Sequence, residues 1–202
     1  MADFEKQSYW KDRFASETEF EWLLPSEDFV SICRPYLVNL SSDARILQLG
    51  FGTSDLQCHL RSGGFTDVTN VDYEPTAIER GRENEMKAFG DVKMEYEVAD
   101  ATQLELEGQG YDLVVDKSTV DAVSCGGDEA FRRMAQGVRS CLKPGGIWIS
   151  LSFSAWRFDV SDLPFDAEVI AKVPTRKLKP TDPDVFHWCY LLRPKDLTEG
   201  HA

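Results

Sequence analysis

The stretch Ile46-Leu-Gln-Leu-Gly-Phe-Gly-Thr-Ser54 decides the fold of this 202-residue chain. Its apolar first half predicts a buried strand over residues 44–49, and its two glycines predict a tight turn directly after that strand. A helix is expected from about Ser54, whose hydroxyl would cap the first turn, to a stop at Gly63-Gly64. A glycine turn between a strand and a helix is typical of α/β folds that bind a nucleotide or nucleoside.

Downstream of this turn, short β-branched runs alternate with helical stretches. Pro75 suits the first turn of one helix, Gly90 its end, and a turn at 143–146 precedes the fifth strand. The predicted strands cover residues 66–72, 92–99, 111–116 and 147–153, and the predicted helices cover 75–89 and 128–142. This alternation is the signature of a parallel sheet with helices on both faces.

The C-terminal third departs from this alternation. Two strand-like runs, 167–173 and 185–193, are separated by a Pro- and Lys-rich loop without a helical pattern. Strands joined without a crossover helix pair antiparallel, and we expect the last strand to insert beside the fifth. The predicted fold is therefore a Rossmann-like α/β domain whose seven-stranded sheet is parallel except for an antiparallel last strand.

About 40 residues precede the first strand, and they are dense in aromatic side chains. The aromatic residues of this segment include Phe4, Tyr9, Trp10, Phe14, Phe20, Trp22 and Phe29. We expect helices that cover the carboxyl edge of the sheet as a lid. The predicted organisation is a lid segment over 1–40, one domain over 41–196 and a frayed tail over 197–202.

Composition narrows the classes of function. The formal charge of −13 disfavours nucleic-acid binding, which needs clustered Lys and Arg, and suits either a basic protein partner or simple solubility. The start of the chain does not resemble a signal peptide, and no apolar run is long enough for a membrane helix. Five scattered cysteines without a Cys-x-x-Cys motif disfavour disulfides and a metal site. We therefore expect a cytoplasmic, monomeric protein.

Acidic residues follow successive predicted strands at the edge where open α/β sheets bind ligands. Asp55 occupies the place of the third glycine of a dinucleotide motif and would compete with a pyrophosphate for the helix N-terminus, so a phosphate-free nucleoside is favoured. Asp72 can accept both ribose hydroxyls, and Asp100 can accept from an adenine amino group. A fourth strand ends in Asp116-Lys-Ser-Thr-Val-Asp121, at the same edge.

Several motifs together give the chain a specific resemblance. They are Tyr9-Trp10-Lys-Asp-Arg13-Phe14, Phe20-Glu-Trp22, Ile46 to Ser54, Gly63-Gly-Phe65, Val68 to Tyr73, Asp112 to Ala122, Leu142-Lys-Pro-Gly-Gly146 and Phe186 to Leu191. With them the chain resembles the class I S-adenosylmethionine-dependent methyltransferases, in particular the group that includes elongation factor 1A lysine methyltransferase 4. The resemblance covers nearly the whole chain.

The resemblance implies S-adenosylmethionine as the cofactor and a set of contacts to it. With the residues of the glycine turn and the end of the fourth strand included, the predicted cofactor contacts are Trp10, Phe14, Phe20, Gly50, Phe51, Gly52, Asp72, Tyr73, Asp100, Ala101, Asp116 and Lys117. Trp10 would pack near the sulfonium, where a cation–π contact is favourable. Gln48 departs from the family, since many methyltransferases carry an acid there.

The first hypothesis is a protein-lysine N-methyltransferase, with an elongation factor as the substrate that the resemblance implies. At pH 7 only about one lysine amine in 2,500 is neutral, so the site must lower its pKa or remove its proton. Asp116, Asp121 and His187 are the candidate catalytic groups, and no metal is expected. A small-molecule methyltransferase and a non-catalytic cofactor-fold module are the alternatives.

Overall fold

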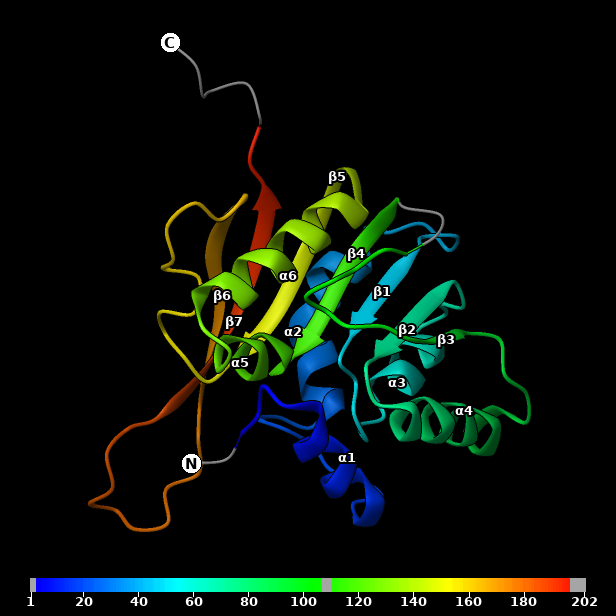
Figure 1. The fold of residues 1–202 in the computed structure, drawn as a ribbon, viewed down its shortest axis with the longest axis horizontal. Helices are drawn as coiled ribbons and strands as arrows, with labels where there is room; N and C mark the ends of the chain where they lie inside the picture. The colour runs from blue at the N-terminus through cyan, green and yellow to red at the C-terminus, as the bar shows by residue number, and fades with distance from the viewer. Residues whose placement is uncertain (1–2, 107–109, 197–202) are drawn as a thin grey trace.

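A seven-stranded sheet forms the centre of the molecule, with the strand order β3-β2-β1-β4-β5-β7-β6 (Figure 1). The computed structural model describes residues 3–106 and 110–196. The strands are β1 (Ile46–Leu49), β2 (Val68–Asp72), β3 (Glu95–Val98), β4 (Tyr111–Lys117), β5 (Leu142–Ser152), β6 (Phe165–Pro174) and β7 (Phe186–Pro194).

Strand directions agree with the prediction from the C-terminal pattern. The first five strands pair parallel, whereas β7 lies antiparallel between β5 and β6, with Leu151 opposite Cys189. The predicted Rossmann-like sheet, parallel with an antiparallel last strand inserted beside the fifth, is therefore confirmed.

Helices cover both faces of this sheet. They are α1 (Gln7–Ser16), α2 (Ser26–Leu37), α3 (Leu56–Ser62), α4 (Pro75–Phe89), α5 (Thr119–Ser124) and α6 (Asp128–Cys141). One core cluster packs α2, α3 and α4 against the sheet, and a second packs α5 and α6 against the opposite face. Within the described ranges no helix is long and apolar enough to cross a membrane.

Side chains along β1 show why both faces are covered. Ile46 belongs to the core cluster of α2 to α4, and its neighbour Leu47 belongs to that of α5 and α6. Alternate residues of a strand point to opposite faces, so a continuous apolar run needs helices on each side. β1 is buried along its whole length.

The aromatic N-terminal segment divides into two parts. α1 lies at the carboxyl ends of the strands, as expected of a lid (Figure 1). α2 does not, because Phe29, Cys33 and Leu37 are buried in the core against the sheet. The lid therefore ends before Ser26. The domain boundary at residue 40 stays a prediction, and the predicted tail lies outside the described residues.

Two local predictions need correction. The Ser54 hydroxyl does not cap α3 but donates to the carbonyl of Phe51 at 3.0 Å, and the helix begins only at Leu56. The predicted turn at 143–146 is part of β5, which starts at Leu142 opposite Tyr111. A register shift after Tyr111, of the kind a β-bulge produces, lets the Lys-Pro-Gly-Gly stretch remain in the strand.

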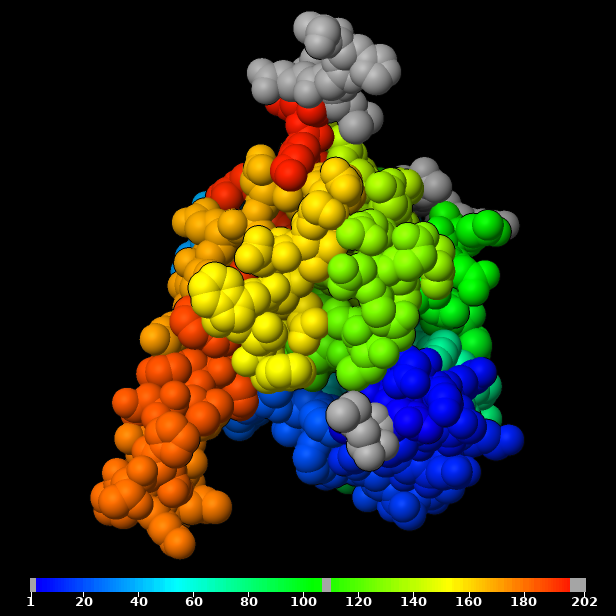
Figure 2. Space-filling view, turned by 60° about the vertical axis from the view of Figure 1, so that its left-hand side comes forward, coloured from blue at the N-terminus to red at the C-terminus, as the bar shows by residue number. Residues whose placement is uncertain are grey.

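The loop between β6 and β7 projects from the body at the same end of the molecule as the N-terminal segment (Figure 2). β6 ends at Pro174 and β7 begins at Phe186, so this loop leaves the sheet at its carboxyl edge. Two irregular segments, the lid and this loop, therefore border the edge where the glycine turn lies.

A buried ion pair joins the helices of the sheet's first half. Arg61 of α3 pairs with Glu85 of α4, which is fully buried, and with Asp91. Glu85 also accepts from the backbone N–H of Lys93 at 2.9 Å, so it ties α4 to the segment leading into β3. Removal of one partner from a buried pair leaves the other charge uncompensated.

We therefore predict that Arg61→Ala lowers the free energy of unfolding by about 3–5 kcal/mol, because Glu85 loses its buried cation. Chemical denaturation is the measurement. Arg193→Ala is the matched control, since its pair with Glu168 is exposed on both sides and is worth at most about 1 kcal/mol. Equal losses in the two variants would contradict the assigned role of the buried pair.

Candidate functional site

A cavity of about 710 Å³ lies at the carboxyl ends of β1, β2 and β4, under the N-terminal lid. Eleven of the residues predicted from sequence line it: Trp10, Phe14, Gly50, Phe51, Gly52, Asp72, Tyr73, Asp100, Ala101, Lys117 and Asp121. Three predicted residues, Phe20, Asp116 and His187, do not. The structure thus brings most of the predicted site together.

The glycine turn is held against the start of α5. Gly50 and Gly52 have φ values of +58° and +55°, a conformation that side chains disfavour. A Cβ on Gly50 would lie 2.4 Å from the Oγ1 of Thr119, whose hydroxyl donates to the carbonyl of Leu49 at 2.8 Å. Glycine is therefore required at position 50 by both backbone conformation and packing.

Asp72 ends β2 and faces the turn. Its Oδ2 accepts from the backbone N–H of Gly52 at 2.9 Å, and its Oδ1 accepts from that of Glu74 at 3.0 Å. Burial raises the pKa of Asp72 to about 6, against the opposing effect of these two hydrogen bonds. Each oxygen keeps a second acceptor site, so the carboxylate is suited to two neighbouring hydroxyls such as those of a ribose.

Asp100 and Ala101 form the next part of the wall, after β3. The Oδ1 of Asp100 accepts from both the backbone N–H and the hydroxyl of Thr102, each at 2.8 Å. Its Oδ2 has only a 3.4 Å contact with Gln103. One oxygen of Asp100 is therefore fixed by its own loop, and the other remains available to an amino group of a ligand.

Aromatic rings from the lid close the cavity on the other side. Phe14 is buried, and its ring centroid lies 5.5 Å from that of Trp10, whose indole donates to the carbonyl of Phe4 at 2.7 Å. Gln7 donates to the carbonyl of Tyr73 at 2.7 Å and so joins α1 to the end of β2.

Phe20 is a correction to the predicted contacts. Its side chain is 41% exposed and packs on the ring of Trp22 and under the guanidinium of Arg13, away from the cavity. Trp22 lines the cavity instead. The sequence motif that contains both rings was recognised, but it did not show which of the two points inward.

Lys117 connects the lid to β4. Its ammonium pairs with Glu21 and donates to the carbonyl of Leu24 at 2.9 Å. Burial lowers the pKa of Lys117, and the pairing with Glu21 opposes this effect. Glu21 also accepts from the backbone N–H of Asp55 at 3.3 Å, so a carboxylate stands where a phosphate would bind the start of α3.

Asp116 is a second correction. It is fully buried on the face covered by α6 and accepts from the indole of Trp148 at 2.8 Å and from the backbone of Val120 at 3.2 Å. Burial raises its pKa to about 7. It precedes Lys117, and adjacent strand residues point to opposite faces, so only Lys117 reaches the cavity.

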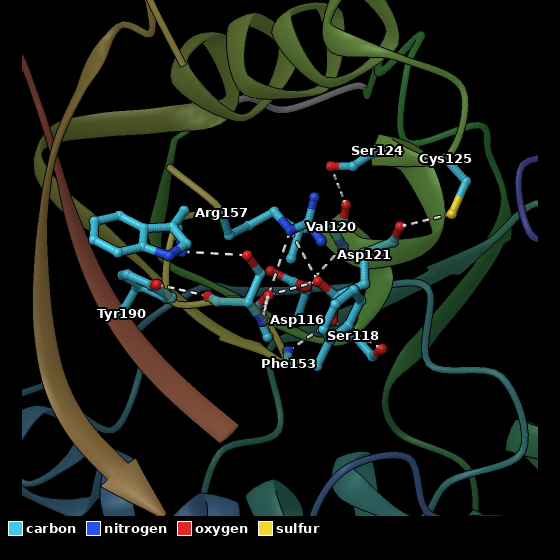
Figure 3. Close-up of polar contacts among 12 residues, drawn as sticks. Asp116, Ser118, Val120, Asp121, Ser124, Cys125, Phe153, Arg157 and Tyr190 are labelled. Carbon is cyan, nitrogen blue, oxygen red and sulfur yellow. Dashed lines mark hydrogen bonds and ion pairs between the residues drawn. The ribbon is translucent and has the colours of Figure 1, made fainter. Parts of the chain in front are cut away.

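Asp121 lies on the cavity wall but is surrounded by donors (Figure 3). Its Oδ1 accepts from Ser152 at 2.5 Å and from Arg157 at 2.9 Å, and its Oδ2 accepts from the backbone of Phe153 at 3.1 Å and from Ser118 at 3.2 Å. Burial raises its pKa, and these contacts oppose the rise. Four donors occupy the carboxylate, which suits it to a scaffold better than to a base.

His187 lies on β7 and outside the cavity wall. Its Nδ1 is buried and has no hydrogen-bond partner among the described residues, and burial lowers its pKa. His187 nevertheless lies next to the wall residue Leu23, whose backbone contacts it, so its predicted catalytic role stays a prediction.

The cavity has an unpaired acceptor of its own. Gln48 lines it from β1, and the Oε1 of this side chain is buried without a hydrogen-bond partner in the part of the chain that the structure describes. A buried acceptor of this kind needs a donor. Together with the free acceptor sites of Asp72 and Asp100 and the aromatic wall, it fits a cationic nucleoside such as S-adenosylmethionine.

Sequence reasoning also missed many other wall residues, among them Leu23 and Phe153. Leu23 has φ +64°, an unusual value for a non-glycine residue, and no sequence signal marks it. Phe153 follows directly after β5, and the rule that ligands meet the carboxyl ends of the strands could have indicated it. Among the described residues no group of His, Cys, Asp and Glu could hold a metal ion.

Comparison with known proteins gives a family match over most of the chain. A model described as a methyltransferase domain matches residues 40–185. Methyltransferase srdJ of Neurospora crassa is 61% identical over 200 residues, covering 96% of this chain and 86% of that protein.

More distant relatives carry a more specific description. EEF1A lysine methyltransferase 4 of Mus musculus is 27% identical, over 78% of this chain and 64% of its own length. EEF1A lysine methyltransferase 2 of Homo sapiens is 29% identical, over 67% of this chain and 58% of its own length. The chain therefore spans less than two thirds of these relatives.

Solved structures share the fold. The N-methyltransferase NodS of Bradyrhizobium japonicum, in complex with S-adenosyl-l-homocysteine, superposes with a TM-score of 0.69 at 13% identity, over 95% of this chain and 98% of that one. A protein from a study of thioacetal formation in echinomycin biosynthesis gives 0.68 at 22% identity, over 94% and 93%.

The pKa of Asp72 leads to a prediction on ligand binding. Above a pKa of about 6 the carboxylate is ionised and could accept two ligand hydroxyls, whereas the protonated form loses an acceptor. Affinity for S-adenosylhomocysteine should therefore be full near pH 7.5 and fall towards pH 5, approaching about tenfold per pH unit below the pKa. Isothermal titration calorimetry across this range is the measurement.

Asp72→Asn is the matched control. It keeps the size of the side chain but does not titrate, so its binding should be weak and independent of pH over the same range. A wild-type affinity that does not change between these pH values would remove the Asp72 carboxylate from the ligand contacts.

Proposed function

The chain belongs to the S-adenosylmethionine-dependent methyltransferases, and from this premise we propose that it methylates a lysine amine in a basic protein segment. The observation that carries the proposal is the charge of the cavity. Its acidic wall residues are Asp3, Glu5, Asp72, Asp100 and Asp121, and its basic ones are Lys117 and Arg133. Both cations are paired, with Glu21 and Glu129 respectively. Of the acidic residues, Asp3 pairs with Lys6 and Asp121 with Arg157, whereas Glu5, Asp72 and Asp100 have no cation partner among the described residues, so the wall favours a cationic acceptor.

The cofactor supplies a methyl group on a positively charged sulfur, and the chain's own residues orient and desolvate the two reactants. Asp72, Asp100 and the glycine turn would hold the nucleoside end. Trp10, Phe14 and Trp22 would exclude water from the reacting end and favour positive charge through their ring faces. Our proposal assigns Asp121 the task of fixing the wall opposite the lid.

A lysine amine must lose its proton before it accepts a methyl group. Asp116 is buried away from the cavity, His187 lies outside its wall, and Asp121 already accepts four hydrogen bonds. None of the three predicted bases therefore stands ready to take the proton. We propose that desolvation under the lid and the like charge of the neighbouring sulfonium together lower the pKa of the amine, against the attraction of the rings and the acidic wall, and that the proton leaves to water.

Relatives support the same substrate class. Two of them bear the description EEF1A lysine methyltransferase, and about three quarters of this chain aligns with that of Mus musculus. By this argument the partner is a basic protein such as an elongation factor, the protein works in the cytoplasm as a monomer, and neither nucleic acid nor membrane is involved.

A small-molecule acceptor is the second candidate, and the lid is the observation that favours it. Trp10, Phe14 and Trp22 lie over the cavity and partly cover a space large enough for a metabolite. The structural neighbour from echinomycin biosynthesis belongs to small-molecule chemistry by its description. A non-catalytic module has less support, because Gly50, Asp72 and the free oxygen of Asp100 all converge on the cavity.

Transfer of a labelled methyl group separates these candidates. We predict that tritiated cofactor and the purified chain label a discrete protein band in a cell lysate, and that pretreatment of the lysate with a reagent that methylates lysines removes the label. Scintillation counting of the protein and small-molecule fractions is the measurement.

Gly50→Ala is the negative control, since its Cβ would collide with Thr119 and disturb the cofactor turn. Label confined to the small-molecule fraction would replace the lysine proposal with the metabolite candidate. Label in neither fraction, with cofactor bound, would favour the non-catalytic module.

A further inference from the structure

Two exposed aromatic rings lie in the segment that follows β5, and the first of them borders the cavity. Phe153 lines the cavity and is 58% exposed, and Trp156 is 75% exposed. Single exposed apolar side chains are common, but two aromatic rings on one short segment can form an exposed apolar patch, and Trp is enriched among residues that dominate binding energy. We name this pair the aromatic ledge.

A hydrogen-bond network holds the loop that carries the ledge (Figure 3). Asp121 accepts from the backbone of Phe153 and from the side chain of Arg157, whose guanidinium lies 5.3 Å from the centre of the Phe153 ring. Tyr190 donates to the carbonyl of Ser154 at 2.7 Å. A ledge fixed in this way loses little entropy when it binds a partner.

The backbone at Trp156 is held as well. Its N–H donates to the hydroxyl of Ser154 at 3.2 Å, and its carbonyl accepts from the N–H of Asp159 at 3.1 Å. The exposed indole is therefore attached to a backbone that hydrogen bonds hold at both the N–H and the carbonyl of Trp156.

The charge around the ledge identifies the kind of partner. Asp159 and Asp162 follow Trp156 in the connection to β6, and both are exposed. Arg132 of α6 donates to the carbonyl of Ser161 in this connection and pairs with Asp128. Arg157 is the cation of this stretch, and Asp121 pairs with it. Within a chain of net charge −13, the ledge is thus an aromatic surface bordered by carboxylates. Such a surface attracts guanidinium and ammonium groups through both ring faces and charge.

We propose that the aromatic ledge binds a basic residue next to the methylated lysine, with the side chain of an Arg or Lys stacked on Trp156 while the target amine enters the cavity past Phe153. This inference rests on the proposed function, because it assumes a protein acceptor. It goes further in naming the residues that select the acceptor and the sequence that they select, a lysine with a basic neighbour.

Two pools of synthetic peptides of equal length test the ledge with the full chain. Each peptide has one central lysine, flanked by arginines in the first pool and by leucines in the second, and tritium transfer is followed for each pool. The wild type should prefer the arginine pool. Trp156→Ala should raise the KM for that pool about tenfold, with kcat and cofactor affinity unchanged, since stacking of a cation acts in binding and not in methyl transfer.

Further variants separate a cation–π contact from simple apolar packing. Trp156→Phe should keep most of the preference for arginine, whereas Trp156→Leu should lose it. Val38→Ala, at an exposed apolar position of the α2 C-terminus, is the control for loss of surface area and should behave as wild type.

Each outcome bears on one claim. Equal KM values for wild type and Trp156→Ala, or a Trp156→Leu variant as selective as Trp156→Phe, would overturn the ledge while the labelled peptides uphold the lysine proposal. Failure of the wild type to label either pool would overturn the proposed function, and the ledge with it.

Discussion

The hydrogen bond from the backbone of Gly52 to the carboxylate of Asp72 joins the ends of β1 and β2, and the site depends on it. It requires a left-handed turn at positions 50 and 52, which only glycine adopts readily. The same turn leaves space for Thr119 to bind the carbonyl of Leu49. Three strands, β1, β2 and β4, are thereby held with their carboxyl ends around one cavity.

The lid depends on a second set of contacts that the fold makes possible. Lys117 ends β4, and its ammonium holds Glu21 and the carbonyl of Leu24 in the lid loop. Because Glu21 also accepts from the backbone of Asp55, the lid loop shields the start of α3. The lid and the glycine turn are therefore parts of one assembly, which explains why a phosphate-binding helix end is absent from this cavity.

The sequence predicted the strands, their directions and the insertion of the last strand beside the fifth, because apolar runs, turn glycines and the lack of a final crossover helix are local signals. It also placed eleven residues at the cavity: the acidic strand ends follow from the rule that the ends of parallel strands meet at one edge, whereas Trp10 and Phe14 of the lid came only from the resemblance. The sequence-based prediction failed where side chains that are close in the sequence point to different sides of the chain. Asp116 and Lys117 are adjacent, and Phe20 and Trp22 are two positions apart in one motif. Packing alone decides which residue of each pair faces the cavity.

The role of Asp121 changes from candidate base to scaffold, because its position in the sequence does not show what its side chain contacts. A carboxylate at a strand end suggests a base when only its position is known, but four donors convert it into the centre of a rigid wall. A wall of this kind orients an acceptor without taking its proton. If the acceptor is an amine, as we propose, its proton would be lost through desolvation under the lid aromatics, which a freely solvated carboxylate in the cavity would oppose. Under that proposal the aromatic cavity and the fully bonded Asp121 act together: the first lowers the pKa of the amine and the second keeps the wall beside it rigid.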